Sequence, residues 1–245
     1  MPDRTPVVIL CGGRGTRLRE HARELPKALV DVGGRPIVDH VVDLYLAHGF
    51  RRVILAAGYR GELLAAHVAG REWPDGVHVE CVDTGADTET GGRVLALAPE
   101  LAGCGCFCLT YADGLADIDL AALLAFHGAH GALATITVVR PELQFGVAQL
   151  DDEDRVLGFV EKPRSERWIN GGFMCLQEEV LARLDGDAVL ERGPLAGLAA
   201  DGELRAYRHE GFWRCMDTYK DAVALNDMCA GGAQPWLAPA VHAAS

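Results

Sequence analysis

The chain lacks any long hydrophobic run. No apolar stretch in its 245 residues approaches the roughly 18 residues that a membrane-spanning helix needs. The first residues, Met1 to Arg4, carry one charge of each sign, and the apolar run Val7–Leu10 is too short for the core of a signal peptide. These absences predict a cytoplasmic protein with no membrane partner.

A surplus of basic residues is also missing. The chain has 23 Lys and Arg against 35 Asp and Glu, which gives a net charge of −12. Nucleic acids and anionic membrane surfaces attract basic proteins, so this balance argues against both as partners. A phosphate-rich ligand would need a local cluster of positive charge inside an acidic exterior.

Paired cysteines of the metal-binding type are absent, although the chain has eight cysteines. Cys104, Cys106 and Cys108 alternate with other residues, and a period of two is typical of one face of a β-strand. Paired zinc ligands are usually separated by about two to four residues and followed by a second pair, and none follows here. We therefore expect eight free thiols, with these three in a row on one strand face.

Internal repeats, low-complexity linkers and breaks in composition are absent too, which favours a single domain. Up to residue 139, apolar strand-like runs alternate with segments of helical periodicity, joined by short connections. This alternation predicts an α/β, Rossmann-like fold: a mixed, mostly parallel sheet flanked by helices. Expected strands cover residues 7–10, 52–57, 77–82, 106–111 and 133–139, and expected helices cover 36–48, 62–68, 93–101 and 118–130.

The pattern changes after Arg140 and Pro141. Strand-like segments are then separated by turns, so we expect antiparallel additions to the sheet. The domain is expected to span residues 1–236, with 237–245 trailing over its surface. The later expected strands cover residues 145–150, 156–161 and 172–176, and the later expected helices cover 178–184, 195–200 and 218–229.

One short stretch is rich in residues that weaken regular structure. The sequence CGGRGTRL follows the first expected strand and contains three glycines and two arginines. Ligands bind at the carboxyl ends of the strands of an open parallel sheet, where glycine amides form a nest for phosphate oxygens. The stretch matches neither G-x-G-x-x-G nor G-K-[ST], and a tight turn with solvated arginines is the alternative interpretation.

Longer stretches favour the phosphate interpretation. GGRGTRLREHARELPKAL resembles the G-G-x-G-T-R-L…P-K signature of sugar-1-phosphate nucleotidylyltransferases. Within that family the chain is most similar to glucose-1-phosphate cytidylyltransferases, and the resemblance implies a nucleotide-diphospho-sugar transferase fold. The further matching motifs are VDTG (82–85), TGGR (90–93), TYADGLADIDL (110–120), FGVAQLD (145–151), EKP (161–163), INGGF (169–173) and GFWRCMDT (211–218).

Three features depart from the family pattern. Cys11 stands where an alanine is usual, Ala112 stands where a glycine is usual, and the segment between Gly70 and Val82 is shorter. Both substituted residues are small, so the chemistry should survive. The shorter segment bears on subunit contacts and sugar choice, in a chain that we expect to form a homo-oligomer.

The resemblance implies an enzyme that uses a nucleoside triphosphate and a sugar 1-phosphate. An oxygen of the sugar phosphate attacks the α-phosphorus and expels pyrophosphate, so many negative charges meet and must be neutralised. Mg²⁺ prefers carboxylates and phosphate oxygens, and Asp113 and Asp217 match the aspartates that hold the metal in the family. Asp113 has an alternative role as a helix cap, which Asp117 or Asp119 is equally placed to fill.

The remaining site residues follow from the family's motifs. Arg17 and Lys27 are expected to bind the triphosphate and Lys162 the sugar phosphate, so these three and Asp113 form the catalytic set. The expected nucleotide-binding set is Leu10, Cys11, Gly12, Gly13, Gly15, Thr16, Arg17, Lys27, Thr88, Gly91, Gly92, Arg93, Ala112 and Asp113. The expected sugar-phosphate-binding set is Glu161, Lys162, Asn170, Gly171 and Gly172.

Base recognition is expected between Thr88 and Arg93. Gly91 and Gly92 would let the backbone approach the base, and Arg93 would donate to the O2 and N3 acceptors of cytosine, whereas uracil and thymine carry a donor at N3. The resemblance to cytidylyltransferases implies CTP as the triphosphate.

Two other interpretations stay open. The same fold could use UTP, dTTP or GTP, or take a cyclitol or modified-sugar phosphate as acceptor. A non-catalytic subunit that binds sugar nucleotides is a third reading, but such relatives usually lose Arg17, Lys27 or a metal aspartate, and all are present here.

Overall fold

The computed structural model describes residues 1–13, 15 and 25–237. Thr16 and Arg17 of the phosphate motif lie outside the described residues, and so does most of the expected surface tail. Among the described residues, no helix combines the length and the apolar character that crossing a bilayer would require.

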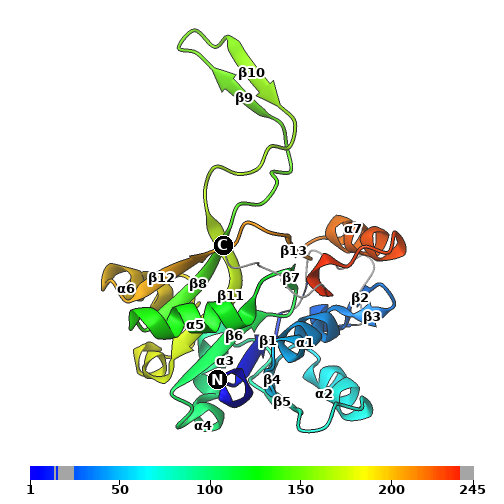
Figure 1. The fold of residues 1–245 in the computed structure, drawn as a ribbon, viewed down its shortest axis with the longest axis vertical. Coiled ribbons are helices and arrows are strands. Elements are labelled where there is room, and N and C mark those ends of the chain that lie inside the picture. Colours follow the sequence, from blue (N-terminus) through cyan, green and yellow to red (C-terminus); the bar gives the residue numbers. More distant parts are fainter. Residues whose placement is uncertain (14, 16–24, 238–245) are drawn as a thin grey trace.

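A seven-stranded sheet forms the centre of the fold, in the order β12-β8-β11-β6-β1-β4-β5 (Figure 1). Strands β6, β1, β4 and β5 run parallel to one another, whereas β11 is antiparallel to both β6 and β8. The predicted α/β fold with a mixed, mostly parallel sheet is confirmed. The strands are β1 (Val7–Leu10), β4 (Arg52–Ala57), β5 (His78–Asp83), β6 (Cys106–Tyr111), β8 (Ala134–Val139), β11 (Ile169–Gln177) and β12 (Leu204–Arg208).

Both faces of this sheet are buried, as alternate residues of β1 show. Val7 and Ile9 pack in one cluster with side chains of α1, α2, α5 and α7, and Val8 and Leu10 pack in a second cluster with α3, α4 and α6. A strand buried on both faces has a continuous apolar sequence, which is why VVIL predicts a strand. The helices are α1 (Ile37–Ala47), α2 (Gly61–Gly70), α3 (Thr90–Ala96), α4 (Ala98–Leu101), α5 (Leu120–His130), α6 (Pro194–Ala200) and α7 (Tyr219–Ala230).

Short elements connect these layers. Strands β7 and β13 pair with each other outside the main sheet, and β2 and β3 form a small hairpin. Their bounds are β2 (Asp31–Val32), β3 (Arg35–Pro36), β7 (Gly114–Ala116) and β13 (Trp213–Cys215), and the 3-10 helices are η1 (Pro2–Arg4), η3 (Lys27–Leu29), η4 (Glu178–Arg183) and η5 (Pro235–Leu237).

Local chemistry explains where elements depart from their expected bounds. Helix α5 begins at Leu120 because the Asp119 side chain caps it, accepting from the Ala122 amide at 2.8 Å. The single helix expected over 93–101 is wrong: α3 begins earlier and α4 follows separately, since Pro99 has no amide hydrogen to continue the first helix. Strands β12 and β13 were not expected.

The prediction of eight free thiols is confirmed, but the predicted row of three cysteines on one strand face is wrong. All eight cysteines are free. Cys106 and Cys108 lie two residues apart in β6, but Cys104 precedes the strand, between two glycines of positive φ, and packs against the other core cluster. The row of three sulfurs therefore does not form.

Of the three segments expected as antiparallel additions to the sheet, 172–176 is confirmed as part of β11, whereas 145–150 and 156–161 form a separate arm. Strands β9 (Val147–Leu150) and β10 (Val156–Val160) pair only with each other, and the ribbon projects away from the sheet beyond β8 and β11 (Figure 1). Every residue of β9 is exposed. The ribbon therefore contributes nothing to the core of its own chain.

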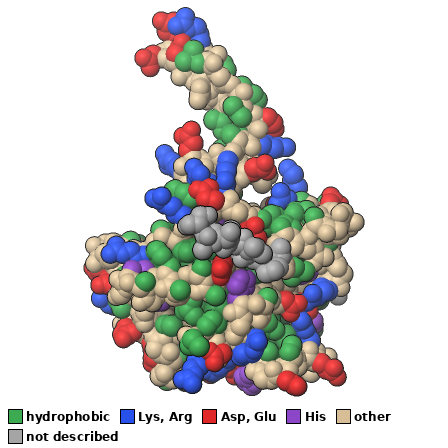
Figure 2. Space-filling model, in the orientation of Figure 1, with side chains coloured by type: hydrophobic (Ala, Val, Ile, Leu, Met, Phe, Trp, Pro, Cys, Tyr) green, Lys and Arg blue, Asp and Glu red, His purple; other side chains and the backbone are tan. Residues whose placement is uncertain are grey.

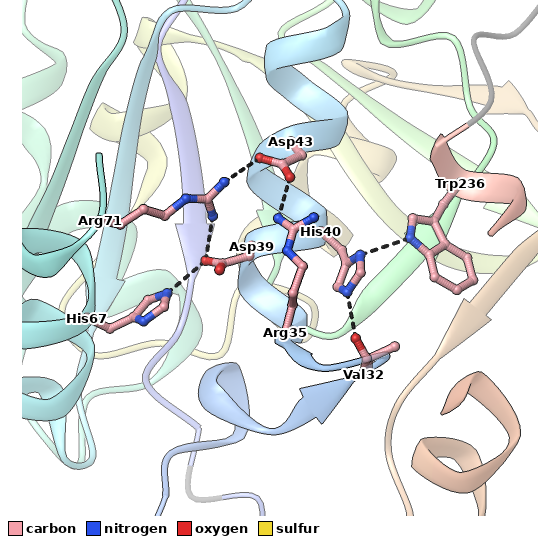
Figure 3. Close-up of polar contacts among 8 residues, drawn as sticks. All are labelled: Val32, Arg35, Asp39, His40, Asp43, His67, Arg71 and Trp236. Carbon is pink, nitrogen blue, oxygen red and sulfur yellow. Dashed lines mark hydrogen bonds and ion pairs between the residues drawn. The ribbon is translucent and has the colours of Figure 1, made fainter. Parts of the chain in front are cut away.

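A network of hydrogen bonds and ion pairs holds α1 and α2 together (Figure 3). Asp39, only 6% exposed, accepts from His67 Nε2 at 2.8 Å and pairs with Arg71 Nη1 at 2.8 Å. Arg71 also bonds to Asp43 Oδ1 at 2.8 Å, and Arg35 binds the same carboxylate. The network ties α1 to α2 and to the hairpin that follows η3.

A second contact drawn in Figure 3 holds Trp236, near the end of the domain, against His40 of α1. Trp236 Nε1 donates to His40 Nδ1 at 3.2 Å, so the Nε2 hydrogen of His40 bonds to the Val32 carbonyl at 2.8 Å (Figure 3). Burial lowers the pKa of His40, which keeps the ring neutral in this role. Trp236 is fully buried, so the packed domain extends to that residue.

Candidate active site

A cleft of about 480 Å³ opens at the carboxyl ends of β1 and β6. Its walls come from five separate parts of the chain. They are the end of β1 with the loop that follows (residues 10–13 and 15), the start of η3 (27–28), residues 86–90 with Arg93, the end of β6 with the two residues after it (111–113), and Asp217. This is the edge of a parallel sheet at which ligands bind in such folds, as the sequence predicts.

Two carboxylates meet at this cleft because a short ladder brings them together. Asp113 precedes β7 and Asp217 follows β13, and these strands pair with Cys215 opposite Gly114. The Met216 amide also donates to the Asp113 carbonyl at 2.9 Å. The two aspartates expected to hold a metal are therefore neighbours in space.

The ammonium of Lys27 lies between these carboxylates. Its Nζ donates to Asp113 Oδ2 and, at 2.6 Å, to Asp217 Oδ1. Burial disfavours the charged lysine, but the two carboxylates outweigh it, and the pKa of Lys27 is raised. One ammonium does not neutralise two carboxylates, so the cluster keeps a negative charge.

This donor set fits a hard divalent cation. Ligand atoms of Asp113, Asp217 and Cys215 lie within 4.8 Å of one another. Burial, followed by the charges of the two aspartates, raises the pKa of the Cys215 thiol, and a sulfur ligand suits softer metals than Mg²⁺. Two carboxylates with room for phosphate oxygens suit Mg²⁺. The position of the Lys27 ammonium shows that the two carboxylates stabilise positive charge at this point.

Arg93 has a different role from the one expected. Its side chain is only 4% exposed, and Nη1 donates to the Ala57 carbonyl at 3.0 Å, Thr84 Oγ1 at 2.8 Å and the Gly85 carbonyl at 2.7 Å. Nη2 lies 3.4 Å from the carbonyls of Gly12 and Ala86. The guanidinium thus braces the loop after β1 against the ends of β4 and β5, which leaves it poorly placed to read cytosine.

Gly12 and Gly13, in the loop after β1, are glycines for different structural reasons. A Cβ at Gly12 would lie 1.9 Å from Arg93 Cζ, so this glycine makes room for the arginine. Among the described residues, no heavy atom lies within 4 Å of a Cβ placed at Gly13. Gly13 is therefore the glycine whose bare backbone faces open space in the cleft.

Gly91 and Gly92 do not line the cleft. Their Cβ positions would fall 2.6 Å from the Ala188 carbonyl and 2.3 Å from Asp187 Oδ1. Both glycines therefore allow close packing against residues 187–190, and the expectation that they admit a nucleotide base is corrected. Thr88 does line the cleft, together with its neighbours 86–90.

A second cavity, of about 1130 Å³, adjoins the first and shares Asp217 with it. It lies at the root of the arm, and Lys162 is part of its lining. Arg140 and Arg164, which also line it, are both paired with Glu210. Figure 2 shows basic side chains gathered at this root.

The other expected sugar residues lie beside these cavities. Glu161 is exposed, with Oε1 3.9 Å from Lys162 Nζ. Gly171 and Gly172 form an irregularity in β11, where Gly172 has a φ of +77° and the Gly171 carbonyl accepts from Trp213 Nε1 at 2.8 Å. Asn170 Oδ1 accepts from the Gly172 amide at 3.0 Å, and a Cβ at Gly172 would lie 3.2 Å from Cδ2 of Tyr111, which lines the first cleft.

Sequence reasoning missed Glu191, whose carboxylate binds Tyr111 and Thr90 at the edge of the first cleft. No motif quoted from the sequence contains it, and no charge pattern singles it out. Only the packing of residues 187–191 on α3 brings it there.

The family follows from the match of sequence to known proteins. Residues 6–198 match the family model described as nucleotidyl transferase. The chain belongs to the nucleotidyl transferase family. The resemblance seen in the motifs is therefore confirmed, and the chain is an enzyme of this transferase family.

Three relatives match most of this chain. A protein of Bacillus subtilis (strain 168) named "probable glucose-1-phosphate cytidylyltransferase" is 39% identical over 250 residues, covering 94% of this chain and 98% of that protein. Glucose-1-phosphate cytidylyltransferase of Salmonella typhi is 38% identical, with 94% and 97% covered. A probable mannose-1-phosphate guanylyltransferase 1 of Oryza sativa subsp. japonica is 32% identical, with 88% and 62% covered.

Solved structures support the fold. HddC from Yersinia pseudotuberculosis, solved in complex with GMP-PN, superposes with a TM-score of 0.71 at 20% identity, covering 91% of this chain and 98% of HddC. At 20% identity, this similarity supports a shared fold and carries no conclusion about function.

The two neighbouring glycines of the first loop make a matched test. Gly12→Ala should displace Arg93 and lower the melting temperature, since overpacking a buried site typically costs about 1–3 kcal/mol. Gly13→Ala should melt like the wild type but bind the triphosphate about tenfold more weakly, because its methyl group occupies space meant for phosphate oxygens. Thermal melting and calorimetric triphosphate binding measure both effects. A Gly12→Ala protein as stable as the wild type, or normal binding by Gly13→Ala, would contradict this division.

Proposed function

We propose that this protein transfers a cytidylyl group from CTP to a sugar 1-phosphate, with glucose 1-phosphate as the acceptor, and releases pyrophosphate. The observation that carries this proposal is the 38–39% identity, over nearly the whole of both chains, to glucose-1-phosphate cytidylyltransferases. Guanylyltransferase relatives are less similar, and the chain covers only 62% of their length. Eight free thiols suit the reducing cytoplasm as its compartment.

In this proposal an oxygen of the sugar phosphate attacks the α-phosphorus, and the bond from that phosphorus to the bridging oxygen of pyrophosphate breaks. Asp113 and Asp217 would hold Mg²⁺, which when bound neutralises charge on the phosphates. Lys27, which donates to both carboxylates here, would donate to the phosphates. The amides after β1 would bind the triphosphate, together with Thr16 and Arg17.

The acceptor would enter from the second cavity. Lys162 lines this cavity, which shares Asp217 with the nucleotide cleft, so a sugar phosphate bound there lies next to the metal-binding carboxylates. Lys162 would bind the phosphate and Glu161 the sugar hydroxyls. Lys162, the lysine of the EKP motif, is the cation that we assign to the acceptor phosphate, and Arg140 and Arg164 beside it are paired with Glu210.

Base recognition would fall to residues 86–90. These line the cleft, whereas the Arg93 guanidinium is bonded to protein oxygens and Gly91 and Gly92 face residues 187–190. Since backbone groups and Thr88 then distinguish the base, UTP, dTTP or GTP remains the alternative to CTP.

Pyrophosphate release with each triphosphate tests the proposal. We expect turnover with glucose 1-phosphate, Mg²⁺ and CTP to exceed that with UTP, dTTP and GTP. Asp113→Asn should lose at least about a hundredfold in rate, the scale of losing charge stabilisation at a reacting phosphate. Asp75→Asn, at an exposed turn, is the matched control and should retain full rate. Preference for another triphosphate would assign the enzyme to a different branch, and full turnover by Asp113→Asn would refute the metal assignment.

We also propose that the protein is a homo-oligomer in which the β9–β10 arm packs against a second copy. An isolated two-stranded ribbon is marginally stable in water. This one exposes Phe145 by 81%, Leu157 by 68% and Phe159 by 65%, and hydrophobic side chains run along it in Figure 2. A second copy supplies an identical ribbon whose backbone edges and apolar side chains match these.

The arm assignment is tested by the mass of the assembly in solution. The wild type should sediment as an oligomer, and Phe145→Ser with Phe159→Ser should shift it to monomer, because the apolar surface that drives association is lost. Phe126→Ser, an exposed phenylalanine on α5 away from the arm, is the control and should leave the assembly unchanged. A monomeric wild type would refute the proposal.

A further inference from the structure

Residues 187–191, which lie between η4 and α6, grip the first turn of α3. Asp187 Oδ1 accepts from the Glu89 amide at 2.6 Å, and the Ala188 carbonyl accepts from the Gly91 amide at 2.8 Å. The Leu190 amide donates to Thr90 Oγ1 at 2.9 Å. Free amides at a helix start need acceptors, and here a distant segment of the chain supplies them.

Glu191 extends this grip into the centre of the site. Its Oε2 accepts from the Thr90 hydroxyl at 3.0 Å, and its Oε1 accepts from the hydroxyl of Tyr111. Tyr111 is the last residue of β6, two positions before Asp113, and a Cβ at Gly172 of β11 would lie 3.2 Å from its Cδ2. One carboxylate therefore joins the wall of the nucleotide cleft to a strand end that lies beside the expected sugar motif.

The hydrogen bonds of Tyr111 and Thr90 determine how their hydroxyls point. The Tyr111 hydroxyl donates to Glu191 Oε1. Thr90 is equally constrained: its oxygen accepts from Leu190, so its hydrogen is left to point at Glu191. Both hydroxyls thus have one fixed orientation.

We propose that Glu191 is a positioning residue that holds the 86–90 wall and Tyr111 at a fixed spacing beside Gly172 of the expected sugar motif, so that nucleotide and acceptor bind in register. This inference rests on the proposed function for the identity of the two substrates. Glu191 does not line either cavity itself, so it acts through Thr90 and Tyr111 and not on the reacting atoms.

Hydrogen–deuterium exchange tests the positioning without any substrate. Glu191→Ala should raise amide exchange in residues 86–93 and 110–113, because the acceptor for two hydroxyls is removed. Glu178→Ala is the matched control: that carboxylate also accepts two hydrogen bonds, from Gly103 and Gly105, but lies away from the cleft. Exchange at 86–93 that is unchanged in Glu191→Ala, or raised equally by Glu178→Ala, would overturn the proposal.

Kinetics with CTP and glucose 1-phosphate then separate positioning from catalysis. We expect Glu191→Ala to raise the KM of both substrates about tenfold, the scale of a lost hydrogen bond to a charged group, with a smaller change in kcat. Glu191→Gln should be impaired less than Glu191→Ala, since its amide oxygen still accepts from one of the two hydroxyls. Loss of kcat alone, or a Gln variant as impaired as Ala, would show a direct chemical role and overturn the inference. A wild type inactive with every triphosphate refutes the proposed function, while the exchange result still decides the role of Glu191.

Discussion

The site depends on one electrostatic arrangement: Lys27 held between Asp113 and Asp217. Like charges do not stay together in a partly buried cleft unless a cation offsets them. The β7–β13 ladder places the carboxylates side by side, and η3 delivers the lysine between them. Because the lysine does not neutralise both carboxylates, the fold keeps a standing preference for further positive charge at this point.

A second cation, Arg93, organises the cleft in a different way. Its guanidinium donates to carbonyls at the ends of β1, β4 and β5, so it ties three strand ends together. Lys27 and Arg93 therefore have different roles. Lys27 faces carboxylates at the place of chemistry, and Arg93 faces backbone oxygens and holds the frame around it.

Sequence predicts the parts of this protein that are governed by local patterns. The strands at 7–10, 52–57 and 106–111 have the expected bounds because both faces of the sheet are buried and the apolar runs are unbroken. Motif matching also places Lys27, Asp113 and Asp217 in one cleft. Sequence fails where a residue's environment comes from far along the chain. Gly91 and Gly92 pack on residues 187–188, and the β9–β10 segments carry a strand pattern that does not tell whether the partner is the central sheet.

The central claim is that Asp113 and Asp217 form a cation site that Lys27 fills until a metal arrives. Mn²⁺ accepts the same oxygen ligands as Mg²⁺ and its binding is followed by electron paramagnetic resonance. In the absence of nucleotide, Lys27→Met should bind Mn²⁺ at least about tenfold more tightly than the wild type, because no ammonium competes for the carboxylates. Adding Asp113→Asn to that variant should abolish the gain. Equal Mn²⁺ affinity in the wild type and Lys27→Met, or binding that survives Asp113→Asn, would contradict the account.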